Sequence, residues 1–320
     1  MAPAMPHPDG DAVSGSHPRL SALVARARER AAGQLPALAL VYPGDVLALD
    51  AAARIQRAAL ARPVLIGPRE LIIRAAAEAG VDAGAFEIID TGEAASDAAA
   101  RACDLARAGN VQALMKGSLH TDELMSAVVN KTKGLRGPRR ISHAFVFDLP
   151  RYPKLLALAD CVVNIAPDLK TKRDIVGNAV TLLQQLGIAE PLVGIVTAVE
   201  LVNPAIPATL DAQALVALSL QDEWPGAVVE GPFGFDNVIS AEAARIKKMV
   251  SRVAGQADLL LMPDLNAGNM LYKSFNYIGG GDCAGLVLGA TVPIVLTSRA
   301  DSLQSRIASV ALAVLTAKSS

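Results

Sequence analysis

A lysine, a glycine, a serine and a histidine follow one short apolar segment, in an order that suits anion binding. The segment VQALMKGSLHTDELM, residues 111–125, begins as a buried strand and becomes polar at Lys116. Gly117 lets backbone N–H groups approach a ligand, and the N-terminus of the helix that follows favours negative charge. The order differs from that of a P-loop, where a glycine precedes the lysine. One interpretation is therefore a phosphate site that includes Lys116, Gly117 and Ser118. The other is an ordinary turn with a solvated lysine, in which Ser118 or Thr121 caps the helix.

Two of the four histidines, His120 and His143, lie outside the N-terminal region and are placed to titrate in a site. His120 belongs to the polar turn, where it could bond a phosphate or carbonyl oxygen. His143 begins an apolar segment, and this position favours a structural role. No spacing of histidines and cysteines indicates a metal site.

A second candidate pair, Ser298 and Arg299, comes directly after the apolar segment PIVLT. Arginine offers two parallel donors that match a phosphate or an oxyanion. Ser298 is not part of a GxSxG turn, so a hydrogen-bonding role fits it better than that of a covalent nucleophile. Asp301 and Gln304 have the spacing of a capping pair for the last helix.

A run of cations without an intervening acid follows the first candidate site. Its members are Lys131, Lys133, Arg136, Arg139 and Arg140. Such a run usually forms a solvated surface, but it could also hold the phosphates of a large anionic cofactor such as coenzyme A (CoA). The glycine-rich stretch at residues 279–285 precedes an apolar segment instead of following one, so it is not a dinucleotide-binding fingerprint.

The composition excludes several classes of protein. Hydrophobic residues make up 52% of the 320 residues and charged residues 19%, which excludes disorder for most of the chain. Aromatic residues make up only 3% and the net charge is -1, which argues against a nucleic-acid or membrane-surface partner. Three widely spaced cysteines indicate a reducing compartment, and no apolar run reaches membrane-spanning length. We therefore expect a cytoplasmic protein, with residues 1–16 as a disordered tail.

Short apolar segments alternate with helical patterns from about residue 18 to the end of the chain. The apolar segments are continuous, as in strands covered by helices on both faces, so we predict an α/β protein with largely parallel sheets. Segments expected to form strands include ALALVYP, ALMKG, CVVNI and PIVLTS. The polar stretch at residues 130–143 is the best candidate for a domain boundary.

Polar side chains follow many of these expected strands. In open α/β sheets ligands bind outside the carboxyl ends of the strands, so we expect these residues to gather at one edge. They are Lys116, Ser118, His120, Glu200, Glu230, Asp236, Asn237, Asp264, Asn266, Asn269, Ser298, Arg299 and Asp301.

The motifs LMKGSLHTDEL, ISHAFVFDLP, EGPFGFDN, PDLNAGNML and VPIVLTSRADS, in this order, resemble those of the phosphate acetyl/butyryltransferase family, and of its butyryltransferase-like branch in particular. The resemblance implies interconversion of acyl-CoA and phosphate with acyl phosphate and CoA. CoA would be a co-substrate, with no resident cofactor and no metal. It also implies a homodimer of chains with two α/β/α domains and an interdomain cleft, as in isocitrate and isopropylmalate dehydrogenases. The first domain would comprise residues 17–143 plus 299–320, and the second residues 144–298.

The resemblance also implies site residues. Ser298 and Arg299 carry over directly, and Lys116, Ser118, His120 and Asn269 are expected in the cleft; Gly117 and Asp264 complete the candidate substrate site. Acetyl-type members have an acid where this chain has Ser305, and Asp301 is the nearest replacement. They also carry an arginine where this chain has Leu124 and Met125. With Val128, these two residues predict an apolar pocket that favours propionyl- or butyryl-CoA if one face of this helix borders the cleft. The alternative is that they face the core and leave the pocket unchanged.

Two alternatives stay open from the sequence alone. One is an NAD-dependent dehydrogenase with the same fold, although no cluster of metal-binding aspartates is present. The other is a relative that binds CoA or phosphate without catalysis.

Overall fold

A computed structural model describes residues 17–296 and 301–317 of the chain. The strands are β1 (Ala37–Val41), β2 (Arg62–Gly67), β3 (Glu87–Asp90), β4 (Ala113–Lys116), β5 (Ser142–Asp148), β6 (Leu156–Ala159), β7 (Leu192–Val196), β8 (Val228–Phe233), β9 (Leu259–Leu261), β10 (Asp282–Leu288) and β11 (Ile294–Val295). The helices are α1 (Pro18–Ala31), α2 (Val46–Arg57), α3 (Arg69–Ala79), α4 (Ala95–Arg107), α5 (Thr121–Val128), α6 (Leu169–Gln185), α7 (Pro207–Ser219), α8 (Phe235–Ile239), α9 (Ala241–Ile246), α10 (Leu265–Tyr277) and α11 (Leu303–Thr316), with a 3-10 turn at Ala83–Ala85.

The strands form one continuous eleven-stranded sheet in the order β3-β2-β1-β4-β11-β10-β5-β6-β9-β7-β8. This confirms the predicted α/β class with mostly parallel pairing. Strands β1 to β5 and β11 run one way, and β6 to β10 run the other way, because the neighbours β11, β10, β5 and β6 pair antiparallel. The expectation of a single edge for all strand ends is therefore wrong: the two sets of strands end at opposite ends of the sheet. The division into two domains stays a prediction.

One expected strand, CVVNI at residues 161–165, is a turn. The carboxylate of Asp160, at the end of β6, accepts hydrogen bonds from the N–H groups of Val162 at 2.8 Å, Val163 at 3.0 Å and Asn164 at 3.3 Å. An aspartate that binds the amides just after it curls the backbone and removes those donors from a sheet. The apolar run therefore becomes a compact turn.

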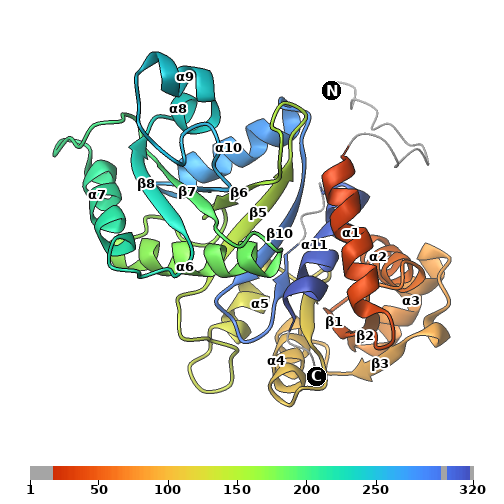
Figure 1. The fold of residues 1–320 in the computed structure, drawn as a ribbon. Coiled ribbons are helices and arrows are strands. Elements are labelled where there is room, and N and C mark those ends of the chain that lie inside the picture. The colour runs from red at the N-terminus through yellow and green to blue at the C-terminus, as the bar shows by residue number, and fades with distance from the viewer. Residues whose placement is uncertain (1–16, 297–300, 318–320) are drawn as a thin grey trace, which may run out of the picture.

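Helices cover both faces of the sheet, as continuous apolar strands require. One face packs against α1, α2, α3, α6, α7 and α11, and the other against α4 and α5 in the first half and α8 to α10 in the second. The last helix returns to the beginning of the chain, where α11 lies beside α1 and α2 (Figure 1).

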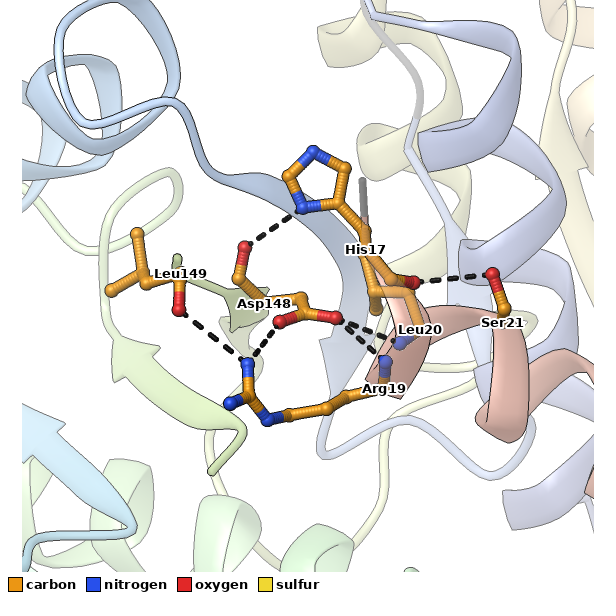
Figure 2. A network of polar contacts seen from close by, with 6 residues as sticks. All are labelled: His17, Arg19, Leu20, Ser21, Asp148 and Leu149. Carbon is orange, nitrogen blue, oxygen red and sulfur yellow. Dashed lines mark hydrogen bonds and ion pairs between the residues drawn. The ribbon is translucent and has the colours of Figure 1, made fainter. Parts of the chain in front are cut away.

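The start of α1 is held to the end of β5 by Asp148, whose side chain is 2% exposed (Figure 2). Its carboxylate accepts the backbone N–H of Arg19 at 2.7 Å and pairs with the guanidinium of Arg19 at 2.6 Å. It also accepts the N–H of Leu20 at 3.3 Å. One buried carboxylate thus receives the otherwise unpaired amides of a helix N-terminus and a cation, which joins residues far apart in the sequence.

Replacing Asp148 with alanine should lower the free energy of unfolding by about 2 kcal/mol, since hydrogen bonds to charged groups contribute about 1.5–3 kcal/mol. Chemical denaturation would measure the loss. Asp50→Ala is the matched control, because its ion pair with Arg54 is half exposed and should be worth less than about 0.5 kcal/mol. Equal small losses in both variants would contradict this account of α1.

Candidate active site at the ends of β4 and β11

The turn after β4 is fastened to the turn after β1. The N–H of Gly117 donates to the carbonyl of Val41 at 2.9 Å, and that of Ser118 donates to the carbonyl of Tyr42 at 3.0 Å. The hydroxyl of Ser118 also donates to Tyr42 at 2.7 Å and accepts the N–H of Gly44 at 2.8 Å. The amides of Gly117 and Ser118 are therefore already used within the protein, which leaves anion binding at this turn to side chains.

Gly117 is required by the close approach of these two turns. A Cβ atom at this position would lie 2.5 Å from the carbonyl oxygen of Val41 and 2.7 Å from that of Tyr42. Both distances are shorter than van der Waals contact, and both acceptors are backbone atoms. Only glycine therefore fits here without moving β1 or β4.

Lys116 and His120 stand at the two ends of the turn. The half-buried ammonium of Lys116 donates to the carbonyls of Gly117 at 3.2 Å and Leu119 at 3.1 Å, which holds it against the turn. His120 is exposed and is the N-cap residue of α5, and its N–H donates to the carboxylate of Glu123 at 2.8 Å. The cap is therefore neither Ser118 nor Thr121, which the interpretation of an ordinary turn had offered.

The strand β11 is the direct neighbour of β4, with Val295 paired in parallel with Met115. Ser298 and Arg299, which follow β11 in the sequence, lie outside the described residues. The next candidate, Asp301, is half-buried, and it is not the cap of α11. That role belongs to Ser302, whose hydroxyl accepts the N–H of Ser305 at 2.9 Å.

The negative charge of Asp301 acts on two side chains, one in α10 and one in β10. Burial is the main cause of the raised pKa values of Tyr272 and Cys283, and the Asp301 carboxylate raises both further. The ring of Tyr272 stacks on that of Phe145 in β5, with 4.2 Å between centroids. These contacts bring α10, from the second half of the chain, to the segment that precedes α11.

The remaining substrate candidates lie at the start of α10. Asn269 is half-buried and donates from its side-chain amide to the carbonyl of Cys161 at 3.3 Å. Asp264 caps α10 by accepting the N–H of Ala267 at 3.0 Å. Both residues follow β9, which runs opposite to β4. The structure therefore places them with the turn after β6, and not with the turn after β4.

Asp160, which the sequence analysis did not single out, organises that turn. Besides the turn amides, its carboxylate accepts the side-chain amide of Asn164 at 2.6 Å and the N–H of His143 at 3.2 Å. An aspartate directly before the expected strand CVVNI was the available signal. The imidazole of His143 is buried, and neither ring nitrogen has a hydrogen-bond partner in the part of the chain that is described. Burial lowers its pKa to about 4, against a smaller opposing effect of Asp160, so the ring is neutral near pH 7.

The cationic run lies at the surface, and its members differ in their surroundings. Arg136, Arg139 and Arg140 line a hollow of about 590 Å³, together with Lys170 at the start of α6. Lys131 and Lys133 are exposed outside that hollow. Lys170 was missed because it is distant in sequence from the run and follows no strand.

The residues expected to form an apolar acyl pocket are mostly core residues. Leu124 and Val128 are both 0% exposed and pack under α4, while Met125 is half-buried against the same cluster. Their burial means that Leu124 and Val128 cannot line a pocket.

The described residues contain no group of three or more His, Cys, Asp or Glu side chains arranged to hold a metal ion. In residues 17–296 and 301–317, no helix combines the length and the apolar character needed to cross a membrane.

Comparisons with known proteins agree on one family. Residues 91–314 match the family model described as phosphate acetyl/butaryl transferase. The phosphate acetyltransferase of Rhizobium meliloti is 48% identical over 294 residues, which cover 92% of each chain. The phosphate butyryltransferase of Clostridium acetobutylicum is 37% identical over 89% of this chain and 94% of that protein. The crystal structure of a branched-chain phosphotransacylase from Enterococcus faecalis superposes with a TM-score of 0.78 at 27% identity, covering 89% of this chain and 100% of the other.

The buried neutral imidazole predicts a pH dependence of stability. The pKa of His143 in the folded protein is about 4, below the ordinary 6.5, so protonation favours the unfolded chain. Its contribution is therefore fully present above pH 6.5 and is lost as the pH falls toward 4, at up to about 1.4 kcal/mol per pH unit. Thermal unfolding between pH 7 and pH 4.5 should show a flatter dependence in His143→Phe than in the native protein. His120→Asn, which removes an exposed histidine, should keep the native dependence. Parallel losses in native protein and His143→Phe would refute this assignment.

Proposed function

The chain belongs to the phosphate acetyl/butaryl transferase family, and we propose that it performs the reaction of this family beside the adjacent carboxyl ends of β4 and β11. It is an acyltransferase that interconverts a short-chain acyl-CoA and phosphate with acyl phosphate and CoA. The observation that carries this conclusion is the 48% identity with a phosphate acetyltransferase over 92% of both chains. CoA is a co-substrate in this proposal, and no resident cofactor or metal takes part.

The reaction joins a phosphate oxygen to the thioester carbonyl carbon, after which the C–S bond breaks and the thiolate of CoA leaves. Both substrates are anionic, so cationic side chains must hold them together. We assign phosphate binding to Arg299 and Lys116, supported by the pairing of the strands that precede them. Ser298 would donate a hydrogen bond to the developing oxyanion, worth about 3–4 kcal/mol by analogy with known oxyanion holes.

A proton must reach the leaving sulfur in this direction and must leave the thiol in the other. We assign this transfer to Asp301 or His120. Asp301 is supported by its half-buried position in the segment that precedes α11. His120 is supported by its exposure at the first turn of α5, at the end of the same turn as Lys116.

Gly117 and Ser118 hold the turn in place in this scheme. Asn269 and Asp264 lie with the turn after β6, and we assign them no direct role. The NAD-dependent alternative is not carried forward, because the sequence similarity over 92% of the chain is to a phosphate acetyltransferase. A measurement of acyl phosphate formation decides for or against the alternative of a protein that binds CoA or phosphate without catalysis.

We propose acetyl-CoA as the preferred acyl donor. The higher identity is with a protein named for acetyl transfer, and the burial of Leu124 and Val128 removes the reason to expect a larger apolar pocket.

A cytoplasmic homodimer completes the proposal. Large apolar side chains are exposed over α9, α10 and the loop after β7, at Leu201, Ile246, Met270 and Ile278, and a second copy of the chain could cover them. The described cysteines are all buried and free, as in a reducing compartment.

Lys116→Met should raise the KM for phosphate about tenfold or more, because it removes a charge-assisted hydrogen bond. The KM for CoA should change little. Initial rates at varied phosphate concentration measure the effect, and Arg28→Met, which removes an exposed cation on α1, should leave both constants unchanged. An unchanged KM for phosphate in a folded Lys116→Met protein would return the lysine to a purely structural role.

Specificity constants for acetyl-, propionyl- and butyryl-CoA test the acyl preference. We expect the highest value for acetyl-CoA. An apolar pocket would instead favour the four-carbon group by about tenfold, since each buried methylene contributes about 0.8 kcal/mol. A clear preference for butyryl-CoA would overturn the acetyl assignment without affecting the reaction type.

A further inference from the structure

The first half of α11 is attached to β10 by hydroxyl groups. In the part of the chain that the structure describes, β11 pairs with β10 only where Val287 lies opposite Ile294, so β10 extends beyond this neighbour. Farther along β10, the N–H of Gly285 donates to the hydroxyl of Ser309 at 2.9 Å, and this hydroxyl donates to the carbonyl of Ser305 at 2.7 Å. Helix α11 therefore supplies a hydrogen bond where β11 does not.

Asp282, the first residue of β10, holds the beginning of α11. Its half-buried carboxylate accepts the hydroxyl of Ser302 at 2.9 Å and the hydroxyl of Ser305. It also accepts the N–H of Cys283 at 2.9 Å. Because the helix dipole favours an acid near the N-terminus, the charge of Asp282 adds to the effect of these bonds. One carboxylate therefore determines where α11 starts relative to the sheet.

Residues 296–301 connect β11 to Ser302, the N-cap of α11. This connection includes Ser298, to which we assign the oxyanion hydrogen bond, and Arg299, to which we assign phosphate binding. It begins at the end of β11, which pairs with β4. It ends at Ser302, which is bound by Asp282. The sheet therefore fixes both ends of the connection, one through strand pairing and the other through a single side chain.

We propose that Asp282 is a positioning residue for acyl transfer and that it acts through Ser302 and Ser305. It fixes one end of the connection that carries Ser298 and Arg299. The inference rests on the proposed function, which assigns roles in the reaction to these two residues. A displacement of about 1 Å can slow an enzyme about 10²-fold, so loss of this attachment should lower kcat. Asp282 does not bind CoA in this scheme, so the KM for CoA should not change.

The variants Asp282→Ala and Asp282→Asn test the positioning role. Asp282→Ala should lower kcat by about tenfold to hundredfold and leave the KM for CoA at its native value. Asp282→Asn keeps an oxygen acceptor at the same place, so it should recover part of the lost kcat and retain the native dependence of kcat on pH. Unchanged kcat in a folded Asp282→Ala protein would overturn the proposal. So would an Asp282→Asn variant that is as slow as Asp282→Ala and has an altered pH profile, because Asp282 would then transfer the proton itself.

Asp258 offers a matched control for the loss of a structural carboxylate. It directly precedes β9, at the same end of the sheet as the start of β10. It accepts the N–H of Leu192 at 2.9 Å and pairs with Lys154 at 2.6 Å, so its bonds do not involve α11. Asp258→Ala should lower the Tm at least as much as Asp282→Ala does, but should keep the native kcat at a temperature where both variants are folded. Equal losses of kcat in the two variants would contradict a positioning role.

A double-mutant cycle on kcat tests whether Asp282 acts through the two serines. In the variant Ser302→Ala/Ser305→Ala, the further change Asp282→Ala should lower kcat much less than it does in the native protein, because the hydroxyls that it binds are already absent. The same fold-loss of kcat in both backgrounds would refute action through Ser302 and Ser305.

Hydrogen exchange separates this inference from the proposed function. The N–H groups of Ser305 and Arg306 donate to Ser302 in the first turn of α11, and their exchange should be faster in Asp282→Ala than in Asp258→Ala or the native protein. Native protein that forms no acyl phosphate would overturn the proposed reaction and the positioning role together, while exchange would still measure the attachment of α11. Native turnover with an unchanged kcat in Asp282→Ala would overturn the positioning role alone.

Discussion

The hydrogen bonds of the buried carboxylate of Asp160 determine the conformation of the turn after β6. A buried charge is tolerated only when hydrogen bonds replace its lost hydration, and Asp160 accepts them from β5, from Asn164 and from the amides of its own turn. The turn held in this way presents the carbonyl of Cys161 to Asn269 and places Asn164 on the wall of the hollow. One carboxylate thus sets the positions of both Asn269 and Asn164.

The first half of the site depends on a different kind of constraint. The turns after β1 and β4 touch through backbone atoms at Gly117 and are joined through the hydroxyl of Ser118. The backbone amides of Gly117 and Ser118 donate to carbonyl groups of the other turn, so they are not available to an anion. In our proposal phosphate is therefore bound by long cationic side chains and not by these amides.

The α/β class and most of the strands were predictable, because continuous apolar runs and helical periodicity are local properties of the sequence. The direction of the strands was not, since it follows from the antiparallel pairing of β5 with β6 and β10, which no local pattern reveals. The turn at residues 161–165 was missed for a related reason. Its apolar residues are typical of a strand. The segment forms a turn because Asp160 accepts hydrogen bonds from its backbone amides.

The shared turn of Lys116 and His120 was predictable, because one short motif contains both residues. The hollow beside the cationic run was not predictable, because it is assembled from distant segments: Lys170 joins Arg136 and Arg140 only in the folded chain. Helix caps were misplaced by one or two residues, because serine, threonine, aspartate and histidine can all serve and the backbone selects among them.

The central claim is that this chain transfers an acyl group from sulfur to a phosphate oxygen. The most direct test is to incubate the purified protein with acetyl-CoA and fully ¹⁸O-labelled phosphate and to weigh the products by mass spectrometry. The account predicts acetyl phosphate that retains every labelled oxygen, because the carbonyl carbon is attacked and no P–O bond breaks. Release of free acetate at a rate independent of phosphate, or no loss of acetyl-CoA at all, would contradict it.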